Sequence, residues 1–420
     1  MLDILNIRKE LYGDWTRLVV DVSFSGVDVP YEEKTMYFSV RNENADMLTD
    51  EVYDAFFLVP LYLAMYHHTD LHIHGKVSKR LYKNIMWYVR QILCDFSDDL
   101  KMIDVQVDGF STIKGQGNLI GTGISCGVDS LCTIYDHFVK EADEEYKINS
   151  LFLFNCGTHG DFENPDSYKL YESRYHLNKQ AADELGLPVY QVQSNLHAFT
   201  HKIGEQKMGY FAIYSCVLSI QKSISLYYAS SADSYKQILQ YHKWMHDFDL
   251  AGYAESYLIP LIQTEHTRLV VDGCQYRRSQ KVQKIADWEI ARRHLNVCVN
   301  TTDGTNCCRC SKCFRTIFPL EAMGKLEQFN AVFDLKKYKK YKKYAYLTKL
   351  RMVGNYAKDG DNGDTVDFAR ANGLPMPNRL LAKMFVHAGG GNCKRKKDIA
   401  IIIGRRRLSE GKAYCSGVSA

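Results

Sequence analysis

Short apolar runs alternate with longer helical patterns between about residues 115 and 326, and this alternation constrains the fold more than any other feature of the chain. Strands are predicted at residues 119–124, 151–155 and 189–192, and helices at residues 130–140, 166–185 and 208–229. Strands that alternate with helices form parallel sheets covered by helices. The sequence therefore predicts an α/β core with a parallel sheet.

Residues 1–115 lack this regular alternation and are predicted to form a small α+β domain. Helices are expected at residues 51–66 and 78–96, and strands at residues 16–25, 34–41, 71–74 and 103–107. The strand segments alternate in polarity or are rich in β-branched residues, whereas the helical segments are strongly apolar or have helical spacing. We therefore divide the chain into an N-terminal domain (1–115), a core (116–330) and a C-terminal extension (331–420).

The composition is that of an ordinary globular protein, because 46% of the 420 residues are apolar and 24% are charged. This balance argues against disordered and fibrous proteins. The longest apolar run, residues 55–66, is too short to cross a bilayer and contains Pro60. The first residues are charged and lack the apolar stretch of a secretory signal. We therefore expect a cytoplasmic protein with no membrane partner.

The net charge of +4 is unevenly distributed. Residues 331–420 contain 20 Lys and Arg against seven Asp and Glu, which gives +13 there and leaves −9 for the rest of the chain. Lysine pairs alternate with Tyr338 and Tyr341 at residues 336–343, and short basic clusters follow at residues 394–397 and 405–407. Such a segment suits nucleic acid, an acidic protein partner or plain solvation, and the sequence leaves these interpretations open.

A glycine-rich turn, GTGISCGVDSL at residues 121–131, follows a predicted strand and opens a predicted helix. This arrangement directs backbone N–H groups and the positive end of a helix dipole at a bound anion. Gly127 allows a conformation with positive φ and close approach of the backbone, and Ser125 and Ser130 offer hydroxyls to phosphate oxygens. Asp129 is better suited to ordering the loop or holding Mg²⁺. The turn is neither a Walker loop nor a Rossmann fingerprint.

Four cysteines with the spacing C-x8-C-x2-C-x2-C, Cys298, Cys307, Cys310 and Cys313, predict a metal site. Four thiolates fill the tetrahedral coordination of Zn²⁺ and leave no position for an activated water, so such a site is structural. An iron–sulfur cluster also fits the spacing. Cys308 offers a competing thiol. The odd total of 13 cysteines, without a predicted export signal, argues against a disulfide framework.

The glycine-rich turn resembles the SGGxDS motif of the PP-loop family of N-type ATP pyrophosphatases. Ser125, Gly127, Asp129 and Ser130 match that motif, and Cys126 stands in place of its first glycine.

With the cysteine spacing added, residues 121–315 resemble the cyano-deazaguanine synthases, which are PP-loop enzymes of queuosine biosynthesis. Residues 155–157 (NCG) and 178–188 also look like that family. The N-terminal region and the basic end are not part of the basic synthase. The chain is therefore similar to extended members, such as those of antiphage defence systems, in which the deazapurine chemistry is directed at a protein.

The resemblance implies a PP-loop parallel-sheet core, a structural zinc, and ATP as a substrate with Mg²⁺. The implied reaction is adenylation of a carboxylate, of the deazaguanine type, followed by attack of an amine that is ammonia or belongs to a partner protein. Residues expected to bind the nucleotide are Ser125, Cys126, Gly127, Val128, Asp129, Ser130, Asn155 and Gly157. Residues expected to act in catalysis are Asp129 and two cations at the start of a helix, Arg278 and Lys281.

Two further residues, His159 and Asp161, lie just after a predicted strand and are candidates for the same region, because ligands of open parallel sheets bind beyond the carboxyl ends of strands. Two other functions stay open at this point. One is a PP-loop enzyme that modifies tRNA by thiolation or amidation, using the basic end for RNA. The other is a module that binds nucleotide without turnover.

Overall fold

The computed structural model describes residues 1–113, 117–157, 159, 165–203, 205–241, 251–301, 303, 305–356 and 360–390. These residues form two compact units. The first unit contains Met1–Tyr276 and the short segment His294–Asn296. The second contains Arg277–Arg293, Val297–Thr301 and the described residues from Thr305 onward.

A ten-stranded mixed sheet forms the centre of the first unit, in the order β10-β9-β6-β7-β8-β3-β2-β1-β4-β5. The bounds of its strands are β1 Leu2–Tyr12, β2 Trp15–Phe24, β3 Thr35–Arg41, β4 Leu71–Val77, β5 Val105–Phe110, β6 Leu119–Gly123, β7 Ser150–Asn155, β8 Val189–Ser194, β9 Ile224–Ser230 and β10 Arg268–Asp272. Most neighbouring pairs are parallel; the pairs β8–β3, β3–β2 and β2–β1 are antiparallel. The molecule is thus a mixed α/β protein, as the alternation predicts.

The strands β10, β9, β6, β7 and β8 form an uninterrupted parallel half of the sheet. The chain enters at β6, continues through β7 to β8 on one side, and then returns to place β9 and β10 on the other side of β6. The direction of winding therefore reverses at β6. In open parallel sheets, ligands bind at such a reversal, outside the carboxyl ends of the strands.

The N-terminal strands extend the same sheet. Phe38 of β3 pairs with Ser194 of β8. The Asn195 side chain bonds to the backbone near the start of β3 through both amide atoms: Oδ1 accepts from Tyr37 N (2.9 Å) and Nδ2 donates to Thr35 O (2.8 Å). The predicted boundary at residue 115 consequently falls between two strands of one sheet. The structure groups residues 1–113 with the parallel half because backbone pairing between β3 and β8 joins them.

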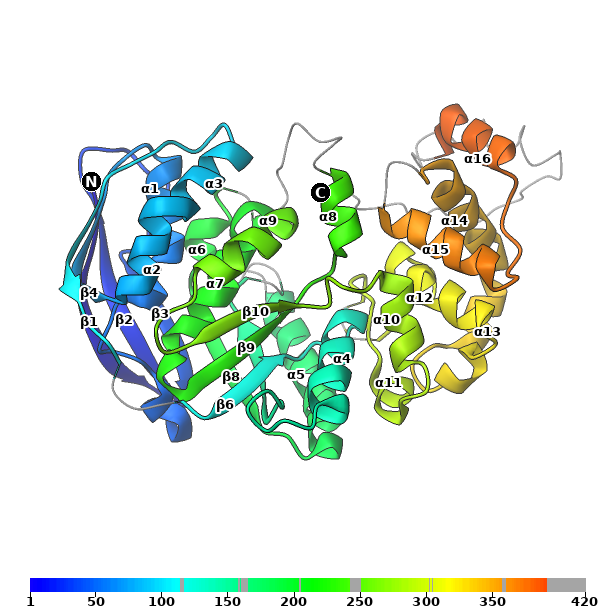
Figure 1. Ribbon diagram of the computed structural model, residues 1–420, viewed down its shortest axis with the longest axis horizontal. Helices are drawn as coiled ribbons and strands as arrows, with labels where there is room; N and C mark the ends of the chain where they lie inside the picture. Colours follow the sequence, from blue (N-terminus) through cyan, green and yellow to red (C-terminus); the bar gives the residue numbers. More distant parts are fainter. Residues whose placement is uncertain are drawn as a thin grey trace. The chain divides into compact units, whose positions relative to one another are not determined.

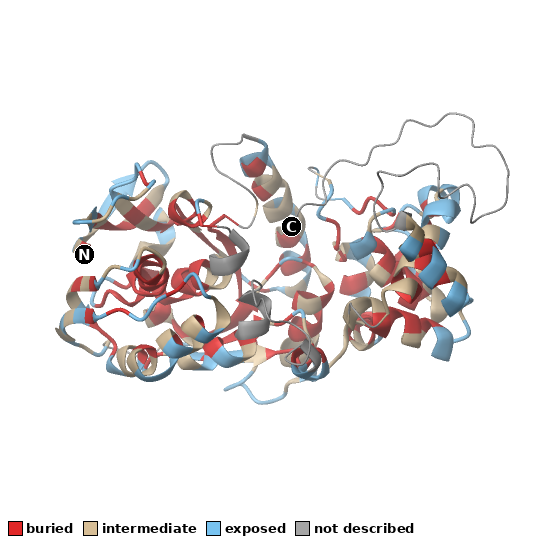
Figure 2. Ribbon diagram, turned by 90° about the horizontal axis from the view of Figure 1, so that it is seen from above, coloured by how far each residue is buried: buried red, intermediate tan, exposed pale blue. Residues whose placement is uncertain are grey.

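Helices cover both faces of the sheet, with α4 and α5 on one face and α7 on the other (Figure 1). The helices of this unit are α1 Leu58–Tyr66, α2 Lys79–Asn84, α3 Arg90–Phe96, α4 Val128–Ile134, α5 Pro165–Leu185, α6 His197–Thr200, α7 Glu205–Ser219, α8 Tyr235–Tyr241 and α9 Ala251–Leu258. A π-helical turn joins α2 to α3, and another, Tyr135–Lys140, extends α4. Figure 2 shows buried residues concentrated along the strands and the inward sides of these helices.

One prediction for this unit is wrong. Residues 208–229 are not a single helix, because α7 ends at Ser219 and the chain then turns through Gln221–Ser223 into strand β9. The segment ISLYYAS of β9 is rich in β-branched and aromatic residues, which suits a strand, and apolar residues on both sides of the turn obscure the boundary.

The second unit is helical around the four-cysteine segment. Its helices are α10 Arg278–Ile285, α11 Glu289–His294, α12 Ser311–Ala322, α13 Leu335–Lys340, α14 Lys342–Gly354, α15 Gly360–Ala371 and α16 Arg379–Phe385. Its core contains fully buried phenylalanines, of which Phe314 and Phe318 stack one turn apart on α12. In the part of the chain that the structure describes, no helix combines the length and hydropathy needed to cross a membrane.

Candidate functional site

The glycine-rich turn lies at the carboxyl end of β6, where the direction of winding reverses. The Oγ atoms of Ser125 and Ser130 are 3.1 Å apart, Gly127 N donates to Ser125 Oγ (3.3 Å), and Ser130 Oγ donates to Gly127 O (3.3 Å). Val128, buried behind the turn, begins α4. The turn thus gathers two hydroxyls and the first N–H groups of a helix at one point, which is the donor set that an anion requires.

Gly127 does not use the positive φ that glycine allows; Cys126 adopts a positive φ in this turn instead, with φ of 51°. Gly127 has φ −74° and ψ 168°, the extended conformation of a residue that caps a helix. A Cβ on Gly127 would lie 3.2 Å from Ser125 Oγ, a tight contact that would require the hydroxyl to shift by a few tenths of an ångström. Cys126 therefore occupies a left-handed position that costs a non-glycine residue roughly 1–2 kcal/mol.

Cys126 has the properties of an unreactive structural thiol. Its side chain is buried, and burial raises its pKa to about 12. Its carbonyl accepts a hydrogen bond from Asn296 N (2.8 Å), which holds the turn in place. A thiol that stays protonated at neutral pH is a poor nucleophile, so the geometry does not support a catalytic role for Cys126.

Asn155, the last residue of β7, has a buried side chain that lacks, in the described part of the chain, the hydrogen bonds such a group normally makes. Its side chain is fully buried, and neither Oδ1 nor Nδ2 has a hydrogen-bond partner among the described residues. A buried amide without partners costs about 1–3 kcal/mol, and buried polar groups in native proteins nearly always have partners. Because β6 and β7 are parallel, Asn155 belongs to the same edge of the sheet as the glycine-rich turn.

Gly157 follows two residues later with φ of 110°, a conformation that L side chains rarely adopt. His159 lies edge-on to Tyr171 of α5, and burial, together with the positive charge of Arg174, lowers its pKa to about 4. The imidazole is therefore neutral at physiological pH. Asp161 lies outside the described residues.

Sequence reasoning missed the part of this edge that β9 and β10 supply. Asp272, the last residue of β10, is buried and accepts hydrogen bonds from Thr133 Oγ1 (2.6 Å) on α4 and from Gln275 Nε2 (3.3 Å). His137 Nε2 is 3.1 Å from the same carboxylate. Burial alone would raise the pKa of Asp272, but these hydrogen bonds lower it. Asp272 thus stays ionised and ties α4 to β10.

The carboxyl end of β9 carries the segment SSADS, residues 230–234. Thr122 Oγ1 of β6 lies 3.1 Å from Ser230 Oγ, and Ser231 N donates to Asp272 O (2.8 Å). A polar cluster after an apolar, aromatic run is the signal that would have revealed both the strand and its end. The assignment of residues 208–229 to one helix concealed it.

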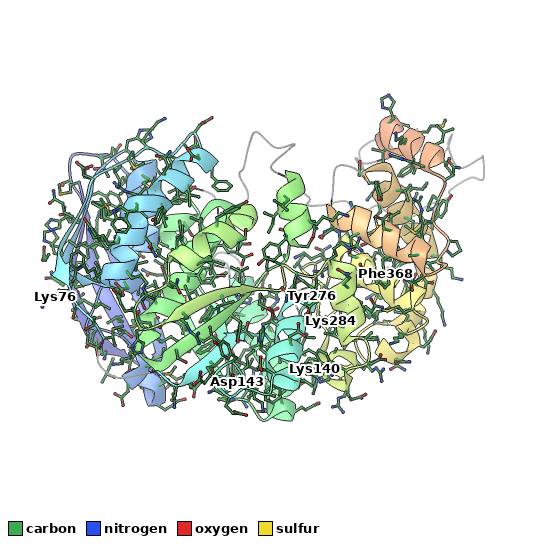
Figure 3. The ribbon with its side chains drawn as sticks, in the orientation of Figure 1. Lys76, Lys140, Asp143, Tyr276, Lys284 and Phe368 are labelled. Atoms are coloured by element: carbon green, nitrogen blue, oxygen red, sulfur yellow. The ribbon has the colours of Figure 1, made fainter. Side chains whose placement is uncertain are left out.

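Arg278 and Lys281 belong to the second unit, near the start of α10. Asp364 of α15 anchors that start by accepting hydrogen bonds from Ser279 N (2.8 Å) and Ser279 Oγ (2.7 Å). Lys281 is fully buried and Arg278 is half-buried. Both lie on α10, the helix that carries Lys284 in Figure 3. A buried lysine is far rarer than a solvated one, so Lys281 does not belong to a merely solvated helix start.

The four predicted cysteines come together in the second unit. Cys298 and Cys310 have their Sγ atoms 3.9 Å apart, as do Cys307 and Cys313, and all four sulfurs lie within 4.8 Å of one another. A zinc ion with bonds of about 2.3 Å to four sulfurs would space them about 3.8 Å apart. The cluster therefore fits one tetrahedral ion such as zinc. In an iron–sulfur cluster the cysteines ligate different irons, which requires wider spacing.

Backbone N–H groups donate hydrogen bonds to sulfurs of the four-cysteine cluster, which favours their negatively charged thiolate form. Asn300 N donates to Cys298 Sγ (3.3 Å), and Cys313 N donates to Cys310 Sγ (3.4 Å) at the start of α12. Asn306 Oδ1 accepts from the backbone N–H of Cys298 (3.2 Å), which shapes the loop. Hydrogen bonds from the neighbouring thiols lower the pKa of Cys298, whereas they raise that of Cys313. One divalent cation would stabilise all four as thiolates.

Cys308 does not compete for the metal. Its Sγ donates to Asn306 O (3.4 Å), and burial raises its pKa to about 11. Its backbone has φ of 57°, and it is absent from the set of mutually close sulfurs. The left-handed turn at Cys308 directs its side chain away and lets Cys307 and Cys310 converge.

The basic segment at residues 336–343 spans α13 and the start of α14. Tyr338 is buried, and its hydroxyl donates to Glu321 Oε2 (2.9 Å). Tyr344 is exposed. The clusters at residues 394–397 and 405–407 lie outside the described residues. Since Tyr338 serves the helical core, only part of the segment presents aromatic rings to a partner.

No protein-family model, curated protein or solved structure matches the chain.

Proposed function

We propose that the protein is an ATP-dependent, AMP-forming enzyme with a PP-loop core. It activates a carboxylate, of the deazaguanine type, as an acyl-adenylate, and an amine then displaces AMP to give an amide. Where the amine is ammonia, a second ATP can adenylate the amide oxygen, and loss of that oxygen with AMP then gives the nitrile. The amine is ammonia or belongs to a partner protein, the second case being the form found in antiphage defence.

The observation that carries the proposal is the buried amide of Asn155, which has no hydrogen-bond partner within the described part of the chain and lies at the same sheet edge as the glycine-rich turn. An asparagine amide offers one donor and one acceptor, the pair that the edge of adenine needs. The turn supplies N–H groups and two hydroxyls for phosphate oxygens. One group suited to a base and another suited to phosphates together fit a nucleotide, and the reversal of winding at β6 is where such sheets bind one.

Each residue near the turn has a role in this mechanism. Ser125 and Ser130 bind phosphate oxygens, and the N–H groups of Gly127 and Val128 stabilise the charge that develops on the leaving pyrophosphate. Asp129, half-buried in the first turn of α4, orders the loop or holds Mg²⁺. The four-cysteine metal site has no open position, so its role is structural.

The test is to incubate the full chain with ATP, Mg²⁺, a deazaguanine carboxylate and ammonium, and to measure AMP and pyrophosphate by chromatography. We expect AMP in the wild type and at least a tenfold loss in Ser130→Ala. Ser225→Ala is the matched control, because Ser225 lies near the amino end of β9, at the opposite edge of the sheet. If the protein binds ATP measurably but the ATP concentration does not change, the proposed enzymatic activity is contradicted. The protein would then be a module that binds nucleotide without turnover.

A second mixture replaces ammonium with candidate partner proteins and follows their intact mass. A partner that gains the mass of the nucleobase only when ATP and the carboxylate are both present would identify the protein amine as acceptor. AMP formation with ammonium alone, and no mass change in any partner, would assign the enzyme to small-molecule chemistry.

A further inference from the structure

Two histidines and two aspartates from three neighbouring strands converge in the N-terminal half of the sheet. His72 and His74 are two residues apart on β4 and therefore share one face of the sheet. Asp3 of β1 is the direct parallel partner of His72, and β5, on the other side of β4, leads to Asp108. Lys76, which is labelled in Figure 3, lies on β4 with the two histidines. Asp3 and Asp108 are far from the two histidines in the sequence, and strand pairing brings the four residues together.

The side chains are in contact. His74 Nε2 is 2.9 Å from Asp3 Oδ1, and His72 Nε2 is 3.0 Å from Asp108 Oδ1. The two imidazole rings have their centroids 3.7 Å apart. One ligand atom each from Asp3, His72 and His74 lies within 4.8 Å of the others. All four side chains are partly accessible to solvent, so an ion can enter from water.

The geometry of the cluster fits a cation. Each imidazole can donate Nε2–H to its carboxylate, but one cation would engage lone pairs of all four groups on this face of the sheet. A divalent metal instead binds two neutral imidazoles through Nε2 and is balanced by two carboxylates. Bonds of about 2.0–2.2 Å to N and O ligands space neighbouring ligand atoms by about 3.3 Å, so the His74–Asp3 and His72–Asp108 contacts need to widen by a few tenths of an ångström. Asp108 lies outside the set of mutually close ligand atoms and has to move further to join the same ion.

We propose that Asp3, His72, His74 and Asp108 form a second metal site, for a divalent transition metal of the zinc class. His72 and His74 bind through Nε2, and Asp3 and Asp108 each contribute one carboxylate oxygen. Borderline metals such as Zn²⁺ favour imidazole with carboxylate, whereas Mg²⁺ and Ca²⁺ favour oxygen alone. The site joins β1, β4 and β5 and so pins β5, which is the last strand of the sheet. It does not depend on the proposed function.

The experiment titrates metal-free full chain with Co²⁺ and follows absorption, because thiolate ligands give intense near-ultraviolet charge-transfer bands and His/Asp ligands do not. We expect the wild type to bind one equivalent of Co²⁺ at the four-cysteine cluster, with charge-transfer bands, and a second equivalent at the His/Asp site, without such bands. His72→Ala/His74→Ala should lose only the second equivalent, and Asp3→Asn, which keeps a similar shape, should weaken it at least tenfold. His176→Ala, an exposed histidine on α5, is the control.

Two results would overturn the proposal. One is a wild type that binds only the equivalent with thiolate bands. The other is a second equivalent that survives in both His72→Ala/His74→Ala and Asp3→Asn. Circular dichroism of each variant verifies that the sheet is intact, and Asp3→Asn keeps the test decisive if the double variant fails to fold.

Discussion

Two buried asparagines in the first unit differ only in their hydrogen bonds. Asn178 of α5 donates to Ile124 O (3.0 Å), just ahead of the glycine-rich turn, and so supports that turn. Asn155 satisfies nothing among the described residues and lies at the edge where a ligand is expected. At the residue scale, function is therefore recognised by a polar group that the fold itself does not need.

Replacing Asn155 by Leu should separate stability from binding. We expect the free energy of unfolding to stay the same or to rise by about 1 kcal/mol, because the variant no longer buries an unpaired amide. Affinity for ATP should fall at least tenfold. Asn178→Leu is the matched control, and it should lose about 1–3 kcal/mol because Ile124 O is left unpaired. Urea unfolding and ATP titration measure both effects; a large loss of stability in Asn155→Leu would contradict the assignment.

His159 should make the protein sensitive to acid. Its pKa is about 4 in the folded chain and about 6.5 when unfolded, so between these values the unfolded chain binds a proton that the folded chain does not. The free energy of unfolding should therefore fall as the pH decreases from 6.5 towards 4. His159→Gln should reduce this fall, measured by urea unfolding at pH 7 and pH 5. Equal slopes in the wild type and the variant would show that His159 is not the group responsible.

At the scale of elements, close approach of strands decides where glycine is required. A Cβ on Gly121 of β6 would lie 2.5 Å from Ser150 O of β7 and 2.5 Å from a ring carbon of Phe152. The carbonyl oxygen is backbone and cannot move without disturbing the pairing that sets the carboxyl ends of β6 and β7. The sheet edge that forms the site thus depends on a glycine ahead of the recognised motif.

Gly121→Ala should lower the free energy of unfolding by about 1–3 kcal/mol, since the added methyl group overpacks a rigid contact. Gly209→Ala provides the contrast, because nothing lies within 4 Å of a Cβ there and the residue is helical. That change should stabilise the protein by roughly 0.5–1 kcal/mol. Thermal or urea unfolding of the pair measures the difference, and equal effects would refute the close-approach argument.

At the scale of the whole molecule, the two units have different sources of stability. The first has an extended apolar core on both faces of a sheet. The second is smaller and has the four-cysteine cluster within it, so its stability should depend on the metal. Metal binding to such a cluster is coupled to folding, because the unfolded chain has no preformed site.

Cys310→Ser should remove bound zinc and lower the unfolding temperature of the second unit by several degrees or more. Cys308→Ser should keep the zinc, because its thiol bonds to Asn306 O and lies outside the cluster. Zinc content by mass spectrometry and calorimetry with and without a strong chelator provide the measurements. A variant at Cys308 that loses the metal, or one at Cys310 that retains it fully, would show that the ligand set is different.

The local features were readable from the sequence because each is encoded by near neighbours. Strand and helix patterns predicted β6, β7, β8 and α4 closely, and cysteine spacing predicted the four sulfurs that converge. Turn geometry was less readable: the left-handed residue is Cys126 rather than Gly127. Burial and the direction of the loop determine which residue adopts the left-handed conformation, and a sequence motif contains neither kind of information.

What the sequence determined by itself was thus the kind of each element and the chemistry of its motifs, because periodicity and spacing act within a few residues. Only the tertiary structure decided that residues 1–113 continue the same sheet, that winding reverses at β6, and that the amide of Asn155 has no hydrogen-bond partner among the described residues. It also decided that Asp3 and Asp108 meet His72 and His74. Strand order and burial arise from pairings between residues far apart in the chain, and no local pattern encodes them.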